Sequence, residues 1–258
     1  EFVPEFVDAF LRIAGKEYFW FDVVSPSVGA LVAPRGKYGI GALAGMETLE
    51  GMARLISHVI DFRSRFTSVH SSGVGAIAEH LARLNHLPDS TCRRVRIAGQ
   101  LHDLGKLSVP KEILEKTAKL TAKEIQTIRA HTFHTYRVLQ TVKGFEHICA
   151  WAAYHHERPD GTGYPFHVKG RKYSLCCQIV TVADVYAALT EDRPYRKGIS
   201  LLRALGVLEK MAEKGELNPM LVAKVRENYR ELDMVRNVAQ ADALKEYENF
   251  SQIRPYKT

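Results

Sequence analysis

The chain has 258 residues, of which 46% are hydrophobic and 25% charged, so it is long enough and apolar enough to bury one substantial core. No apolar run approaches the roughly 18 residues of a membrane-spanning helix, which excludes such a span in this sequence. The net charge of +7 admits anionic partners, but no dense Lys/Arg tract with interleaved aromatic residues is present, so a polymeric nucleic acid is not expected. An ordinary basic surface accounts for the charge equally well.

Cysteine usage and the amino terminus indicate the cellular compartment. The cysteines show no C-x-x-C spacing, which favours reduced, buried thiols over a zinc knuckle; they are Cys92, Cys149, Cys176 and Cys177. The first residues lack the basic-then-apolar layout of a signal peptide, so we expect a cytoplasmic protein. A start at Glu1 rather than Met is compatible with a fragment of a longer protein that carries an upstream sensor or receiver domain.

The sequence predicts an all-α protein in three parts, because the periodic segments repeat at helical spacing and none is typical of a strand. Residues 1–45 contain an aromatic cluster and a Pro/Gly-rich connector, and we expect a cap or linker remnant there. Residues 46–200 should form the principal domain. Residues 201–258 should form a helical extension, packed on that domain or at a homodimer interface, with a last helix that begins at Asn218-Pro219.

Residues 48–85 carry the first strong helical pattern. Its apolar stripe should face the core and consists of Leu55, Val59, Phe62, Phe66, Val69, Ile77, Leu81 and Leu84. The run from Ser71 to Gly75, which holds two glycines, is expected to kink or break this helix. His70 lies inside the stripe, where a histidine is either a hydrogen-bonded core residue or a metal ligand.

Residues 91–104 predict a second helix, which ends in the run His102-Asp103-Leu104-Gly105-Lys106. Gly105 is suited to a left-handed stop at the helix C-terminus. The adjacent imidazole and carboxylate would form a compact half-site for a first-row metal ion, although such a dipeptide also occurs by chance.

A third helix is marked by a capping box of Thr121 with Glu124. Its apolar stripe is made of Ile125, Ile128, Thr132, Thr135, Val138, Leu139 and Val142. His131 lies within this stripe, whereas His134 lies at its polar edge. The spacing therefore favours His131 as the inward-pointing residue, either as a ligand or as a structural histidine.

The segment from 145 to 165 begins as a helix and ends in a Pro/Gly-rich loop. It delivers His155 and His156 just before that loop, which closes with Gly163-Tyr164-Pro165. Neutral imidazole is the commonest side-chain ligand of transition metals. Glu157, which follows the pair, is expected to orient a ligand histidine rather than to bind metal itself.

Residues 174–189 predict a helix in which Asp184 lies beside the buried stripe, where a carboxylate is costly unless it is paired or bound to metal. Several inward histidines and carboxylates in one helical domain would each need a buried hydrogen-bond partner if they were structural. A metal centre explains them together; the residues concerned are His70, His102, Asp103, His131, His155, His156 and Asp184.

The order of these motifs resembles the HD-GYP family of bacterial phosphodiesterases. The resemblance covers about residues 50–200, and it is carried by His70, the run from His102 to Lys106, His131, the run from His155 to Pro165, and the run from Ala183 to Arg196. It implies an HD-type helical bundle and a metal-dependent hydrolase of bacterial signalling. The implied reaction opens cyclic di-GMP to pGpG by attack of a metal-bridging hydroxide, with GMP as a further product left open.

The resemblance also implies roles for individual residues. The seven metal-type residues would bind iron or manganese, with nickel or zinc also compatible, and Asp103 would bridge two ions. Lys106 would share the catalytic role with Asp103 and would contact the substrate phosphates together with Arg193 and Arg196. The Gly163-Tyr164-Pro165 loop would shape the substrate pocket.

The sequence departs from the family pattern at one position, and two alternative functions stay open. Family members with a third metal carry Glu one helical turn before the first histidine; this chain has Phe66 there, so we expect two ions. The mixed cyclic GMP–AMP dinucleotide is an alternative substrate, because nothing in the sequence reads the second base. A catalytically silent module that binds metal or dinucleotide is the alternative from another functional class.

Overall fold

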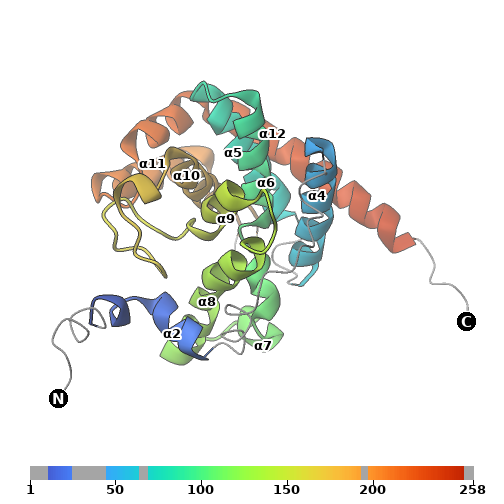
Figure 1. Cartoon of the computed structure of the whole chain (residues 1–258). Helices are drawn as coiled ribbons and strands as arrows, with labels where there is room; N and C mark the ends of the chain where they lie inside the picture. Colours follow the sequence, from blue (N-terminus) through green and yellow to red (C-terminus); the bar gives the residue numbers. More distant parts are fainter. Residues whose placement is uncertain (1–10, 25–44, 64–68, 193–196, 253–258) are drawn as a thin grey trace, which may run out of the picture.

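A computed structural model describes residues 11–24, 45–63, 69–192 and 197–252, and every regular element within them is helical (Figure 1). The all-α prediction is therefore confirmed. None of the described helices combines the length and the hydropathy of a bilayer-spanning segment. In chain order the elements are α2 (Glu17–Val24), α4 (Met46–Arg63), α5 (His70–Leu84), α6 (Asp89–Leu101), η1 (Leu104–Ser108), α7 (Lys111–Leu114), α8 (Ala122–Leu139), α9 (Glu146–Ala153), η2 (Gly170–Lys172), α10 (Leu175–Thr190), α11 (Leu201–Glu213) and α12 (Pro219–Gln252).

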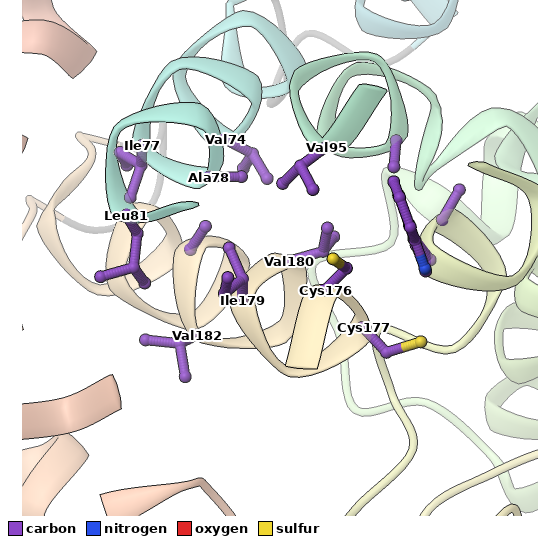
Figure 2. Close-up of a cluster of buried hydrophobic side chains, with 14 of the residues drawn as sticks. Val74, Ile77, Ala78, Leu81, Val95, Cys176, Cys177, Ile179, Val180 and Val182 are labelled. Atoms are coloured by element: carbon purple, nitrogen blue, oxygen red, sulfur yellow. The ribbon is translucent and has the colours of Figure 1, made fainter. Parts of the chain in front are cut away.

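The centre of the core lies between α5, α6 and α10, which meet through small and branched apolar side chains such as Ile77, Val95 and Val180 (Figure 2). A Cβ atom on Gly99 of α6 would lie only 2.9 Å from the Cα atom of Gly75 on α5. These glycines therefore permit two helices to pack closely rather than kinking one of them. The predicted break between Ser71 and Gly75 is wrong, because α4 ends at Arg63 and α5 begins before that run.

The buried face of α4 differs from the predicted stripe. Leu55 and Val59 are 61% and 51% exposed, whereas Ala53, Ile60 and Asp61 are buried. The prediction treated residues 48–85 as one continuous pattern and assigned a single buried face to all of it. Because α4 and α5 are separate helices, the phase that is correct for α5 does not apply to α4.

Local capping signals place helix starts correctly. The capping box of Thr121 with Glu124 is present at the start of α8, and the side chain of Asn218 accepts a hydrogen bond from the Met220 amide at 2.9 Å at the start of α12. Within α8 the predicted stripe is wrong at Ile125 and Val138, which are 46% and 50% exposed. The four cysteines are free and buried, as predicted.

The two ends of the described chain pack on different parts of the bundle. The helix α12 runs along α5 and reaches α4, where Glu246 lies 3.4 Å from Arg54 and 3.6 Å from His58 (Figure 1). The short helix α2 lies against α8, with the ring of Phe21 5.5 Å from that of Phe133 (Figure 1). The division of the chain at residues 45 and 200 stays a prediction.

Candidate metal centre

The predicted ligands come mainly from helix ends and the turns that follow them. His70 is the first residue of α5, His102 directly follows α6, and His155 lies in the turn after α9. The structure brings all seven candidates into one cluster of three overlapping groups: His70 with His102 and Asp184, His102 with Asp103 and His155, and His131 with His155 and His156. Within each group the ligand atoms lie within 4.8 Å of one another. Such a chain of groups could hold a divalent metal.

Three of the histidines are oriented by backbone carbonyl groups of their own helices. The Nδ1 atoms of His102, His131 and His155 donate to the carbonyl oxygens three residues earlier, those of Gly99, Ile128 and Ala152, at 2.7, 2.6 and 2.7 Å. Each bond requires a proton on Nδ1, so the Nε2 atom is the one that points into the cluster. A backbone acceptor on the second ring nitrogen is the usual support of a metal-binding histidine.

The spacing of two of these rings fits a bound cation. The Nε2 atoms of His131 and His155 lie 3.2 Å apart. Burial lowers the pKa of His131 to about 3 and that of His155 well below its usual value, so both rings are neutral near pH 7. Two neutral rings with protonated Nδ1 atoms present two lone pairs to each other, which is unfavourable unless a cation lies between them. The donor set therefore fits a divalent metal, although it does not select one.

His70 is held differently, between two carboxylates. Its Nδ1 atom donates to Glu191 Oε2 at 2.8 Å, and its Nε2 atom lies 3.2 Å from Asp184 Oδ1. Burial lowers the pKa of His70, but the charges of Glu191 and Asp184 outweigh it and raise that pKa well above the usual value. Glu191 was not predicted as a site residue. It lies just beyond the end of α10, and only the folded chain brings it to His70.

Asp103 is the carboxylate nearest the middle of the cluster. Its Oδ1 atom lies 3.4 Å from His131 Nε2, and its Oδ2 atom lies 3.2 Å from His102 Nε2. The ammonium group of Lys106 donates to Oδ2 at 2.5 Å. Burial opposes ionisation of Asp103, but His102 and Lys106 outweigh it and hold the pKa of this carboxyl well below its usual range. Asp103 is therefore an anion that contacts two of the candidate ligand histidines, His102 and His131.

Close packing of η1 on α8 fixes the position of the adjacent residues His102 and Asp103. A Cβ atom on Gly105 would lie 1.9 Å from the His131 carbonyl oxygen, so no larger residue fits there. The Gly105 amide donates to Thr135 Oγ1 at 2.9 Å, and that hydroxyl donates to the His102 carbonyl at 3.0 Å. The prediction of a left-handed stop is wrong, since Gly105 is not among the positive-φ glycines of the described residues.

The Gly-Tyr-Pro loop is tied back to the end of α9. Both carboxylate oxygens of Glu157 accept backbone bonds from the loop, from the amides of Phe166 at 2.7 Å, His167 at 3.2 Å and Val168 at 3.2 Å. A Cβ atom on Gly163 would lie 2.3 Å from the Glu157 Cα atom. Glu157 thus holds the loop rather than a ligand histidine, which corrects the prediction for this residue.

The loop places an aromatic ring over the metal-type cluster. The Tyr164 ring stacks on His156 with centroids 5.0 Å apart, and the guanidinium of Arg129 lies 4.0 Å from the Tyr164 centroid. These residues line a cavity of about 300 Å³ that also includes His155 and Arg158. Arg129 was missed by the sequence analysis, because only the folded loop brings Tyr164 to it. Phe66, Arg193 and Arg196 lie outside the described residues.

Comparison with known proteins gives the family. The HD domain matches residues 52–221. The chain is 34% identical to 3'3'-cGAMP-specific phosphodiesterase 1 of Vibrio cholerae over 219 residues, which cover 84% of this chain and 51% of that protein. It is 40% identical to a cyclic di-GMP phosphodiesterase of Pseudomonas aeruginosa over 158 residues, or 60% of this chain and 37% of the relative. It is 36% identical to the cyclic di-GMP phosphodiesterase response regulator RpfG of Xanthomonas campestris over 173 residues, or 66% and 44%.

A solved structure supports the same fold. An HDG"Y"P protein from Bdellovibrio bacteriovorus superimposes with a TM-score of 0.55 at 14% sequence identity, over 72% of this chain and 65% of that one. The chain spans about half or less of the length of these curated relatives. The match over residues 52–221 nevertheless contains every candidate ligand and most of the helical bundle. The chain therefore belongs to the HD domain family, and its motifs place it with the HD-GYP members of that family.

Proposed function

We propose that this protein is a metal-dependent phosphodiesterase that hydrolyses a cyclic dinucleotide, with cyclic di-GMP as the leading substrate. The observation that carries the proposal is the buried ligand cluster, in which the Nε2 atoms of His131 and His155 face each other at 3.2 Å with Asp103 beside them. The names of the relatives support the substrate class, since they are phosphodiesterases of cyclic di-GMP or 3'3'-cGAMP.

The cluster divides the work between bound ions and side chains. Two divalent ions, when bound, would supply a nucleophile at neutral pH and polarise a phosphoryl oxygen. Asp103, which is ionised and contacts both His102 and His131, would help to hold the ions. Lys106 is 26% exposed while it donates to Asp103, so its ammonium group is placed to meet a phosphate at the edge of the cluster.

The mouth of the site would orient the dinucleotide. Tyr164 and Arg129 line the cavity beside the cluster, and the Arg129 guanidinium on the Tyr164 ring would offer a positive charge to a substrate phosphate. The backbone bonds from residues 166–168 to Glu157 hold the loop rigid, so the ring is positioned before substrate binds. Arg193 and Arg196 are proposed as further phosphate contacts on the basis of the motif alone.

The mixed cyclic GMP–AMP dinucleotide is the second candidate substrate. It is favoured by the Vibrio cholerae relative, which aligns over 84% of this chain. The reaction is the same for both dinucleotides, because the scissile group is a phosphodiester in each. The choice depends on contacts to the second base.

An anaerobic turnover assay tests the proposal. The protein, loaded with Mn²⁺ or Fe²⁺, is offered each dinucleotide separately, and the products are resolved by chromatography. We expect a linear dinucleotide from at least one of them. Asp103→Ala should abolish turnover and metal loading together, and full activity in that variant would show that the assigned centre is wrong.

The alternative of a silent binding module predicts a different result. It predicts no product from either dinucleotide although the protein is folded and loaded with metal. In that case Phe66→Glu, which restores the residue found in members with a third metal, is the first variant to assay. Metal quantitation should give two ions per chain, and three tightly bound ions would contradict the two-ion proposal.

A further inference from the structure

A second cavity, of about 610 Å³, lies between α2, α8 and the segment that follows the Gly-Tyr-Pro loop. None of the seven candidate ligands lines it. It uses the other side of α8, because Phe133, Tyr136 and Arg137 line this cavity, whereas His131 faces the metal-type cluster. The cavity is therefore separate from the site described above and needs an account of its own.

Aromatic rings form much of its wall. The rings of Tyr136 and Tyr154 are nearly parallel, with an interplanar angle of 5° and centroids 6.2 Å apart. Phe166 packs against both, at 5.1 and 5.2 Å, and Tyr18 of α2 stacks on Phe166 at 5.4 Å. All four of these side chains line the cavity, so a flat, aromatic ligand would meet ring atoms on its wall.

Cations surround the same cavity. Lys16, Lys169 and Lys172 line it, and the latter two are exposed at its rim. Within the described part of the chain neither Lys169 nor Lys172 forms an ion pair. Arg137 is 16% exposed and pairs with Asp22 at 2.6 Å, yet its Nε atom is buried without a hydrogen-bond partner. The cavity thus holds an excess of positive charge over the single carboxylate, Asp22, that lines it.

We propose that this cavity binds a purine nucleotide, with the base against the aromatic wall and the phosphate at Lys169 and Lys172. The aromatic wall and the exposed lysines together indicate a ligand that is both aromatic and anionic. An apolar ligand would leave the lysines unused, and inorganic phosphate would leave the aromatic wall unused. A volume of about 610 Å³ is that of an ordinary small-molecule site.

A titration of the metal-free full chain tests the proposal, since chelation removes any metal-dependent binding. Calorimetry compares GMP with guanosine, inorganic phosphate and cyclic di-GMP. We expect GMP to bind at least about tenfold more tightly than guanosine or phosphate, because only GMP engages both features. The titration with cyclic di-GMP distinguishes a site for the free mononucleotide from one that also accepts the dinucleotide.

Two variants and two controls locate the bound nucleotide. Lys172→Glu reverses an exposed charge, and Tyr136→Ala removes one ring; each should weaken GMP binding by about tenfold. Lys245→Glu, which reverses the charge of another exposed lysine, on α12, should bind like the parent, as should His156→Ala in the metal-type cluster. The proposal is overturned if GMP binds no better than guanosine and phosphate. It is also overturned if His156→Ala loses binding that Lys172→Glu keeps, because GMP then occupies the pocket beside the metal centre.

Discussion

Histidine residues of one cluster have opposite protonation tendencies. Burial lowers the pKa of His131 to about 3, so this ring is neutral and ready to donate its lone pair. His70 lies between Glu191 and Asp184, and His102 lies beside Asp103; burial lowers the pKa of each, but the carboxylates outweigh it and raise both values. In the metal-free protein these two rings therefore keep a proton that a metal ion must displace.

Proton release on metal binding is the measurable consequence. At pH 7 we expect about one to two protons to be released per chain, from His70 and His102, when Mn²⁺ binds. Calorimetry in two buffers of different ionisation enthalpy gives the number. Glu191→Gln should reduce it, because the pKa of His70 falls when the Glu191 charge is removed, whereas Glu213→Gln on the exposed face of α11 should not change it. Proton release that is zero in the parent would contradict this electrostatic account.

The direction in which stability depends on pH follows from the raised pKa of His70. A raised pKa in the folded, metal-free state means that the protonated His70 stabilises this state fully below its unfolded value of 6.5, and that this contribution disappears as pH rises through the folded pKa. Metal binding shows the reverse trend, because the proton and the ion compete for the same atoms. Metal affinity should therefore increase from pH 6 to pH 8.

The residues themselves could be predicted from the sequence to different degrees. Histidine and aspartate at inward or helix-terminal positions indicate a metal site from the sequence alone. The structure places all seven of these residues in one cluster. Arg129 and Glu191 carry no such signal, because their importance depends on Tyr164 and His70, which only tertiary packing brings to them. Glu157 was misinterpreted for the same reason, as its partners are backbone amides of the loop nine to eleven residues later.

At the scale of helices, starts were predicted well and buried faces less well. The capping box at Thr121 and the cap at Asn218 depend on neighbours within three residues, so the sequence contains all that is needed. The buried face of α4 depends on where the preceding and following helices lie. Leu55 and Val59 are exposed because α4 packs on its neighbours through Ala53 and Ile60 instead.

The contact between η1 and α8 predicts that adding a single methyl group at Gly105 destabilises the protein. Gly105→Ala would place its Cβ atom 1.9 Å from the His131 carbonyl oxygen, so η1 must move away from α8. We expect a loss of about 1–3 kcal/mol in the free energy of unfolding, together with weaker metal binding at Asp103. Urea denaturation and metal titration measure the two effects.

A second glycine in a helix provides the control for that substitution. Gly206 lies inside α11, and a Cβ atom there would meet nothing within 4 Å. Gly206→Ala should leave metal binding unchanged and stabilise the protein by about 0.5–1 kcal/mol, because alanine is the better helix former. If Gly105→Ala behaved like Gly206→Ala, the close contact would not position His102 and Asp103.

The helix α12 supports the metal-type cluster from a distance. The side-chain amide of Gln240 donates to Glu191 Oε1 at 2.6 Å, while Glu191 Oε2 accepts from His70. Gln240→Leu removes this donor and should weaken metal affinity by about 10- to 100-fold, the usual effect of losing an outer support of a ligand. Electron paramagnetic resonance of Mn²⁺ measures that affinity. Gln126→Leu on the exposed side of α8 is the control, and an equal loss in both variants would show that Gln240 has no specific role.

At the scale of the whole molecule, the ligand cluster joins segments that are far apart in sequence. Its members come from α5, from the chain after α6, from α8, from the turn after α9 and from α10. A metal ion bound only by the folded state stabilises that state by mass action, by about 2.7 kcal/mol at a concentration 100 times its Kd. The metal should therefore act as a cross-link for the bundle.

Removal of the metal tests this role. Chelation should lower the melting temperature by at least about 5 °C, since 1 kcal/mol corresponds to about 2–4 °C for a chain of this size. Restoring Mn²⁺ should recover the original value. An unchanged melting temperature, with the metal shown to be removed, would mean that the cluster is already rigid without it.

Helix α8 carries side chains for the ligand cluster and for the aromatic cavity within about two turns. His131 faces the ligand cluster, while Phe133 and Arg137 line the aromatic cavity on its other side. Inserting or deleting one residue would rotate everything beyond it by about 100°, because a helix turns by that angle per residue. The capping box at Thr121 fixes where the count begins. Substitutions on α8 can therefore be absorbed one at a time, but a change in its length would exchange the residues that face the ligand cluster and the aromatic cavity.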